Sequence, residues 1–564
     1  MAHPRSPLAP LFAACWLTAW AAPAAAFEFE FPWLEEPSSL QLTLTSIYAY
    51  HDDNYNRYAD DDGYHDLRNR LNLKLTVDRF TLSGRFDSNT FIGAPAPSRN
   101  QYNPHYLDRY APEKITAAYR GRGWQVVLGD FYATVGRGLA LHLSKTDQIG
   151  EDTTLLGARG ELCSGPLELE LMSGLANPAN QDLFGKALPE TYDSISALQA
   201  GWRLGDGLRL GVHGVGFVYD PLQRNPRAQD EHLLPRWTTI AGASFEALGV
   251  AERLDLYAEA NWLGRQDRPA PNLEQDEPVL RHGWGAYASA SLLLGDFNLT
   301  AEAKSLDDFA AYSLTWRGGG KYVERRLDYL RPPTLEPANM EVANNSDISG
   351  GRLQLDYRPG GGDSLLFAAY SGFWARDQQA TGDRWIYNLL LGFEQDFLTT
   401  GRARLTVGLR EEVPQYAGGN IYHLLYAEAV VKLPLTRRHS LDLHSVNWFV
   451  HEGAGGHTFD FAKGELTVGY AWSPWLVLDV ILGYDTFPSR SEDPYDMSVF
   501  YRREPGAPLE RQLFLAGSAT VDLWGSYMLR LLAGQTRGGV VCIGGVCREL
   551  PPFAGVRTEL VLRF

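Results

Sequence analysis

Leu71-Asn72-Leu73-Lys74-Leu75-Thr76-Val77 alternates apolar and polar residues without interruption. Successive side chains of a β-strand point to opposite faces, so this segment predicts a strand with one apolar and one polar face. The same alternation recurs at 254–262, 352–358 and 402–410. Gly, Pro, Asp and Asn separate such segments about every ten to fifteen residues. The chain is therefore predicted to be all-β.

The lengths of the connections indicate which kind of all-β fold the chain adopts. Very short connections, such as 78–79, 164–166 and 295–296, alternate with longer polar ones. A transmembrane barrel has tight periplasmic turns and longer outer loops. We therefore predict a single transmembrane antiparallel up-and-down β-barrel of about 24 strands, between about 20 and 26, with periplasmic N- and C-termini. The predicted strands lie near 39–50, 67–78, 80–88, 113–120, 124–132, 153–163, 167–174, 194–204, 208–219, 236–247, 252–264, 283–294, 297–306, 348–358, 364–376, 384–396, 402–412, 421–433, 439–451, 462–472, 475–486, 511–523, 526–536 and 555–564.

The N-terminus predicts export. Residues 1–26 combine a basic Arg5, an apolar run over 8–22 and small alanines before Phe27, which is typical of a secretory signal peptide. Residues 27–38 then form a periplasmic segment, and 39–564 form the barrel. No composition break divides the 564 residues, although this length would ordinarily suggest three or four domains.

Composition excludes two classes of protein. Of all residues, 45% are hydrophobic and 12% are aromatic, which is too many for a disordered chain. The net charge is −17 and there is no basic tract, which argues against nucleic acid as a partner. Outer-membrane lipid and lipopolysaccharide are the expected surroundings, and an acidic first outer loop carries Asp52 and Asp53.

The last strand predicts how the barrel is assembled. Val556, Leu560 and Phe564 lie on one face of an alternating segment that ends the chain. A terminal aromatic residue on such a strand resembles the signal that the barrel assembly machinery reads. Phe564 is therefore the expected assembly signal.

No motif predicts catalysis or a cofactor. The sequence has no P-loop, no His-Glu-x-x-His, no dinucleotide-binding glycine pattern and no haem-attaching Cys-x-x-Cys-His. Outer-membrane hydrolases bring Ser, His and Asp together only in the fold, so His423, His439 and His444 stay open as bases. Solvated histidines are the favoured interpretation, and we expect no enzyme, no cofactor and no metal site.

Two cysteines lie close together near the C-terminus. Cys542 and Cys547 flank a four-residue segment with two glycines in the last outer loop. Glycine allows so short a loop to close, and disulfides form outside the cytoplasm. We predict a structural disulfide, with a redox-active pair as the alternative, and leave Cys163 unpaired.

Charged residues are expected to line the pore. The alternation turns Arg68, Arg70 and Lys74 inward on one strand and Arg402, Arg404 and Arg410 inward on another. Basic rows in a pore concentrate anions. The alternative is that inward carboxylates, such as those of Glu259, Glu302 and Glu559, neutralise them.

Two long connections are expected to obstruct the lumen, because ordered loops of such length usually fold against something. They are 133–152, which contains Arg137, and 307–347. A barrel of so many strands has a wide interior that would leak if unfilled.

Three motifs point to a family. Gly129-Asp130-Phe131-Tyr132 leads into Gly136-Arg137-Gly138-Leu139, Arg331-Pro332-Pro333-Thr334-Leu335 follows in the second long connection, and Cys542 and Cys547 make a Cys-x4-Cys motif. Together they resemble an uncharacterised family of bacterial outer-membrane β-barrels, a domain of unknown function. The resemblance implies a Gram-negative outer-membrane barrel and implies no substrate.

The leading functional hypothesis is a porin-like channel or transport protein with Arg137 in the constriction. One alternative is a barrel sheath or anchor for a periplasmic or surface partner, for example an electron-transfer cytochrome. Another is a surface receptor that acts through its outer loops.

Overall fold

The computed structural model describes residues 27–29, 38–54, 62–94, 106–188, 190–219, 235–267, 279–317, 322–337, 346–376, 383–398, 400–415, 421–454, 457–486, 513–523, 525–543, 546–550 and 552–564. The predicted signal peptide, 1–26, lies outside these residues.

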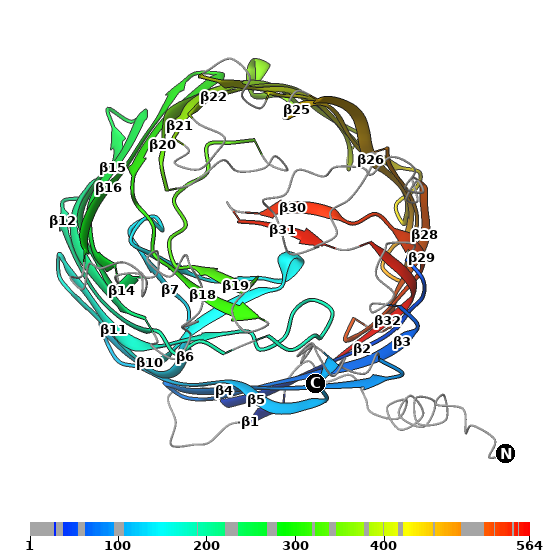
Figure 1. Ribbon diagram of the computed structural model, residues 1–564, viewed down its shortest axis with the longest axis horizontal. Helices are drawn as coiled ribbons and strands as arrows, with labels where there is room; N and C mark the ends of the chain where they lie inside the picture. The colour runs from blue at the N-terminus through cyan, green and yellow to red at the C-terminus, as the bar shows by residue number, and fades with distance from the viewer. Residues whose placement is uncertain are drawn as a thin grey trace.

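The described strands form a closed antiparallel barrel (Figure 1). The main sheet has 26 strands, of which β1 and β9 pair only with the ends of β2 and β10, so that 24 strands make the wall. The ring closes because β2 pairs with β3 on one side and with β32 on the other. The predicted number of strands is confirmed, and each predicted strand overlaps one strand of the wall.

The wall consists of β2 (Ser38–His51), β3 (Tyr64–Val77), β4 (Phe80–Ile92), β5 (Arg109–Arg120), β6 (Trp124–Phe131), β10 (Glu151–Ser164), β11 (Leu167–Pro178), β12 (Ser194–Leu204), β13 (Leu208–Val218), β14 (Pro235–Val250), β15 (Leu254–Asp267), β16 (Val279–Leu294), β17 (Phe297–Asp307), β20 (Ile348–Tyr357), β21 (Ser364–Ala375), β22 (Arg384–Phe397), β23 (Gly401–Pro414), β24 (Ile421–Pro434), β25 (His439–Ala454), β26 (His457–Trp472), β27 (Leu476–Asp485), β28 (Leu513–Leu523), β29 (Tyr527–Thr536) and β32 (Phe553–Arg563). The small β1 (Phe27–Phe29) lies beside β2, and a short 3-10 helix, η6 (Pro359–Gly361), lies in the turn between β20 and β21.

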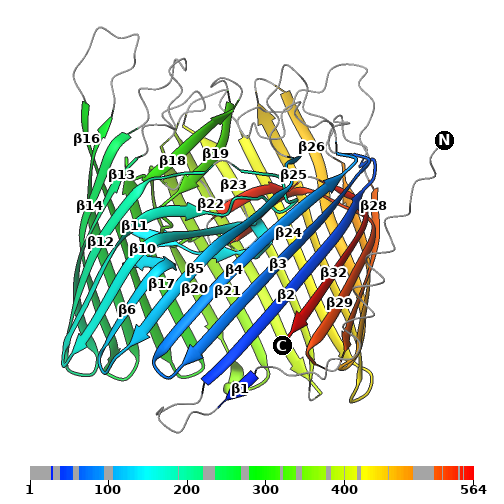
Figure 2. The same cartoon turned by 90° about the horizontal axis from the view of Figure 1, so that it is seen from below.

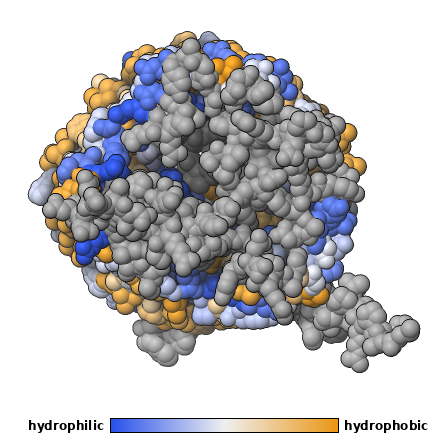
Figure 3. Space-filling view, viewed as in Figure 1, coloured by the Kyte–Doolittle hydropathy of each residue, from blue (hydrophilic) through white to orange (hydrophobic). Residues whose placement is uncertain are grey.

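The wall is apolar outside and polar inside, as β23 illustrates. Leu405 and Leu409 point outward and are 52% and 48% exposed, whereas Thr406 and Arg410 point inward and are 2% and 4% exposed. A soluble protein would bury its leucines and expose its arginines. The reversed arrangement places lipid outside the wall and a polar interior inside it. Seen from the loop end, much of the visible outer rim is hydrophobic (Figure 3).

Exposed tryptophans mark two levels of the outer surface. One group lies beside the short turns and another lies toward the opposite strand ends, which is typical of aromatic girdles at the two membrane interfaces. The first group contains Trp124, Trp202, Trp472 and Trp475, and the second contains Trp262, Trp284 and Trp385.

The two ends of the barrel differ (Figure 2). At one end the connections are short, as between β3 and β4 or between β10 and β11, and at the other they are mostly longer, up to the connection between β17 and β20. Ser38 and Phe564 both lie at the short-turn end. No helix among the described residues is long and apolar enough to cross a membrane.

Phe564 takes part in closing the ring. Its backbone N–H donates to the carbonyl oxygen of Leu42 at 2.8 Å, and its carbonyl accepts from the N–H of Leu42 at 3.0 Å. Its ring lies 5.9 Å from the ring of Tyr527 on the neighbouring β29. The last residue therefore contacts both strands that flank β32.

Deleting Phe564 is expected to lower the fraction of folded barrel, because the closing seam loses its last hydrogen-bonded pair and an aromatic contact. The fraction is measured as the heat-modifiable band on a gel. Phe564→Tyr keeps the ring and the backbone and should fold like the wild type. A normal folded yield without Phe564 would contradict its predicted role as assembly signal.

Candidate functional site

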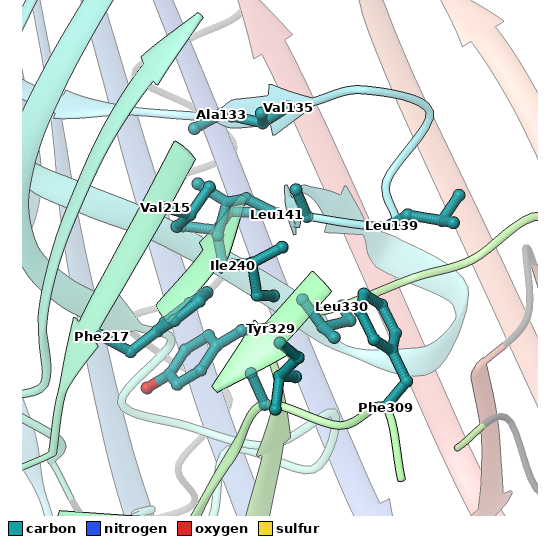
Figure 4. Close-up of a cluster of buried hydrophobic side chains, with 14 of the residues drawn as sticks. Ala133, Val135, Leu139, Leu141, Val215, Phe217, Ile240, Phe309, Tyr329 and Leu330 are labelled. Atoms are coloured by element: carbon teal, nitrogen blue, oxygen red, sulfur yellow. The ribbon is translucent and has the colours of Figure 1, made fainter. Parts of the chain in front are cut away.

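The first long connection folds into the lumen as a small hairpin. It contains β7 (Ala133–Val135), β8 (Leu141–Leu143), β9 (Lys145–Thr146) and the 3-10 helix η3 (Asp147–Ile149). Val135, Leu139 and Leu141 are fully buried. They pack in an apolar cluster with the inner wall and with the second long connection (Figure 4). Each such side chain stabilises the docked hairpin by about 1.5–3 kcal/mol.

A buried carboxylate holds the tip of this hairpin. Glu259 on β15 accepts a hydrogen bond from the backbone N–H of Arg137 at 2.8 Å. The Tyr257 hydroxyl and the Asn261 amide donate to the same carboxylate at 2.5 and 2.9 Å. A Cβ on Gly136, whose φ is +64°, would lie 2.1 Å from the carboxylate. Glycine is therefore required there both for its conformation and for the close approach.

The side chain of Arg137 lies along the wall. Its guanidinium stacks on Tyr257 at 3.7 Å from the ring centroid, donates to Ser289 at 3.2 Å and lies 3.7 Å from the carboxylate of Glu246. Arg137 is still 40% exposed. The predicted constriction residue is thus in the lumen and is held by three strands.

The second long connection packs against the first. After the hairpin of β18 (Tyr312–Arg317) and β19 (Tyr322–Asp328), its backbone runs beside the β7–β8 hairpin. The carbonyl of Tyr329 accepts from the N–H of His142 at 2.8 Å, and the N–H of Arg331 donates to Gly138 at 2.8 Å. The buried Tyr329 hydroxyl donates to Asp193 at 2.6 Å. The two connections therefore form one folded unit inside the barrel.

Arg331 strengthens this contact and acts on the nearby His142. The guanidinium of Arg331 donates to Ser144 at 3.0 Å and pairs with Glu151. Burial lowers the pKa of His142, and the positive charge of Arg331 lowers it further. His142 is therefore neutral in the docked hairpin at neutral pH, 3.2 Å from the Thr134 hydroxyl.

The C-terminal hairpin also reaches into the lumen (Figure 1). Its strands are β30 (Gly539–Ile543) and β31 (Val546–Leu550), and the backbone register sets Cys542 opposite Cys547. Arg548 donates to the carbonyl of Ile149 in η3 at 2.7 Å. The three sequence motifs thus lie on segments that contact one another inside the barrel. Cys163 is exposed and forms no disulfide.

A further inward segment was not predicted. The connection between β11 and β12, at 179–188 and 190–193, lies against β3, β4 and β5. Its carbonyls at Leu183 and Gly185 accept from Arg68 and Asn89, and Asn180 donates to Glu113 at 2.9 Å. The glycine at 185 is the signal that the sequence offered for a turn in this segment. In the structure it adopts a φ of +77°.

The predicted inward arginines lie on the inner wall, mostly beside acids. Arg68 pairs with Asp66 at 2.6 Å and Arg70 lies 3.4 Å from Asp87. Arg410 pairs with Glu412 at 2.6 Å.

The remaining basic residues of the prediction are more exposed. Arg402 pairs with Asp396 at 2.7 Å and is 54% exposed. Lys74 is also exposed. Arg404 is exposed and borders a cavity, with its guanidinium 5.5 Å from the centroid of the Phe367 ring.

Among the described residues, a first and a second cavity lie on the inner wall near the short-turn end. The first, of about 740 Å³, is bordered by β16, β17 and β20 to β23, and by Leu335 and Pro337 of the second long connection. The second, of about 610 Å³, is bordered mainly by β22 to β27 and includes Arg402, Lys432 and Asp479. Both contain polar and charged side chains. They are called here the first and the second cavity.

A closed barrel with an apolar outer face and a polar inner one is the architecture of outer-membrane proteins. The chain is an outer-membrane β-barrel.

Comparisons with known proteins concern the barrel as a whole. No protein-family model and no curated protein matches the sequence. Among solved structures, the siderophore receptor PirA from Pseudomonas aeruginosa is 9% identical with a TM-score of 0.47, over 93% of this chain and 80% of that one. OccK2 (OpdF) from the same organism is 12% identical with a TM-score of 0.38, over 68% and 94%. The outer membrane protein OpdK, also from Pseudomonas aeruginosa, is 13% identical with a TM-score of 0.37, over 68% and 95%.

Gly136→Ala is expected to loosen the β7–β8 hairpin by about 1–3 kcal/mol, because the added methyl meets the Glu259 carboxylate in a strained backbone. Trypsin should then cleave after Arg137 faster than in the wild type, while the barrel remains heat-modifiable. Gly160→Ala on β10 is the matched control, because a Cβ there meets nothing within 4 Å. Equal cleavage of all three proteins would count against the docked hairpin.

Proposed function

We propose that this protein is a porin-like channel or transport protein whose constriction is made by its own inward connections. The observation that carries the proposal is the division of the lumen. Folded segments occupy one part of it, and polar cavities remain beside β17 and β20 to β27. The solute would pass between these segments and the polar wall. We place the short turns in the periplasm, following the usual asymmetry of such barrels.

The inward basic residues are mostly paired with carboxylates, which favours neutralisation over rows of unpaired positive charge. Arg352 pairs with Glu302 at 2.7 Å and Arg530 with Glu559 at 3.1 Å, each across neighbouring strands. Paired charges create weaker fields than rows of one sign. We therefore infer modest ion selectivity, set by exposed groups such as Arg404.

The alternatives are less well supported. A sheath needs room for a protein partner, and the chain's own segments take up part of the lumen. A receptor would act through outer connections, many of which lie outside the described residues.

Several further assignments belong to the same proposal. We propose membership of the uncharacterised barrel family, a non-catalytic role, recognition of Phe564 by the barrel assembly machinery and a disulfide between Cys542 and Cys547. The facing register of the two cysteines supports the disulfide.

The purified barrel is expected to conduct ions in a planar bilayer. Arg404→Glu should shift the reversal potential in a salt gradient toward cation selectivity, because the first cavity changes by two charges. Arg122→Glu, in the turn between β5 and β6, makes the same charge change away from the cavity and should leave the potential unchanged. A silent wild-type barrel would contradict the channel.

Arg137→Ala is expected to raise single-channel conductance or its fluctuation, because the hairpin tip loses its stacking on Tyr257 and its contacts with Ser289 and Glu246. The change should be well under tenfold, since the Glu259 contact is to the backbone and survives. Unchanged conductance, fluctuation and ion preference would remove Arg137 from the constriction.

A further inference from the structure

We propose that the first cavity binds a neutral, polyhydroxylated solute, such as a mono- or disaccharide. This inference rests on the proposed channel function, because it names the class of solute that the same lumen would take. The cavity volume, about 740 Å³, lies within the usual range of small-molecule sites.

The cavity lies at the boundary between the folded segments and the remaining lumen. Leu335 and Pro337 of the second long connection border it, together with six neighbouring strands of the wall. Glu336, between these two residues, is buried and is attracted by Lys304 on β17 and Arg410 on β23. This side of the cavity is therefore held to the wall rather than left loose.

An aromatic ring lies flat against the wall of the cavity. Phe367 on β21 pairs in register with Gly392 on β22, and a Cβ on Gly392 would lie 1.9 Å from the ring. Glycine at 392 thus allows the ring to lie across the neighbouring strand, where it is partly exposed beside the cavity. A flat apolar ring face packs well against the C–H face of a sugar.

Polar groups surround this ring. Asn388 is 1% exposed and donates to the Ser371 hydroxyl at 3.1 Å, yet its Oδ1 accepts no hydrogen bond within the described residues. A buried acceptor without a donor is unusual, and both residues border the cavity. A ligand hydroxyl that enters beside Ser371 would supply the missing donor.

The charges of the cavity argue for a neutral ligand. It is bordered by three guanidinium groups, of Arg352, Arg358 and Arg404, and by three carboxylates, of Asp296, Asp356 and Glu394.

Most of these charges already have partners on the wall. Arg352 pairs with Glu302, Asp356 accepts from Gln354 at 2.9 Å, and Glu394 lies 3.5 Å from Arg402. An ionic ligand would have to break such pairs, at a cost in each case. Hydroxyl groups both donate and accept, so a sugar adds hydrogen bonds without displacing them.

Saturation-transfer NMR on the detergent-solubilised full-length protein tests the site directly. Maltose is the neutral probe, and gluconate and glucosamine are charged probes of related chemistry. Maltose should give a saturable signal at millimolar concentration, and the charged probes should bind at least several-fold more weakly.

Phe367→Leu and Asn388→Leu should each weaken maltose binding between about two- and tenfold, which is the effect of one lost contact. Phe393→Leu is the matched control, since Phe393 lies next to Gly392 and points outward. Heat modifiability verifies that each variant folds. Equal binding by Phe367→Leu and the wild type, or equal signals from gluconate and maltose, would overturn the proposal.

Bilayer recordings separate this inference from the channel proposal. A conducting barrel that shows no maltose signal would refute the sugar site and leave the channel intact. A barrel that binds maltose but never conducts would refute the channel and retain the site.

Discussion

The interior width of a closed 24-strand ring is the constraint on which the rest of this structure depends. Closure pairs the backbone N–H and C=O groups of every wall strand, which is necessary because lipid offers them no hydrogen-bond partners. It also creates a lumen too wide for wall side chains alone to fill. The chain fills part of this lumen with its own connections, which fold inward. They bury an apolar cluster inside a wall whose inner face is otherwise polar.

The buried Glu259 carboxylate shows how such a segment is fixed in place. It receives hydrogen bonds from the wall and from the backbone of the hairpin tip at the same time. Charge-assisted bonds to backbone N–H groups are strong and directional. The tip is thereby set at one position, while apolar burial behind it supplies most of the stabilisation.

The wall could be predicted from sequence because its signal is local. Alternation within about ten residues sets the face of each side chain, and turn residues set the strand ends. Strands as different as β3 and β32 were found in this way. The contents of the lumen were harder to predict, because their contacts join residues that are far apart in the sequence, such as Tyr329 with Asp193 or Arg548 with Ile149. Length identified two inward connections as candidates, but nothing in the periodicity indicated the segment after β11. The alternation does place Asp66 and Glu412 on the same strand faces as Arg68 and Arg410, two residues away, but it does not show that these groups pair.

The central claim is that the lumen is partly filled by the chain's own folded connections. A cryo-electron microscopy map of the protein in lipid nanodiscs tests it most directly. The account predicts ordered density for 133–150 against β12 to β16, with the tip at Gly136 touching Glu259. An empty lumen, or the same connection extended above the barrel, would contradict it.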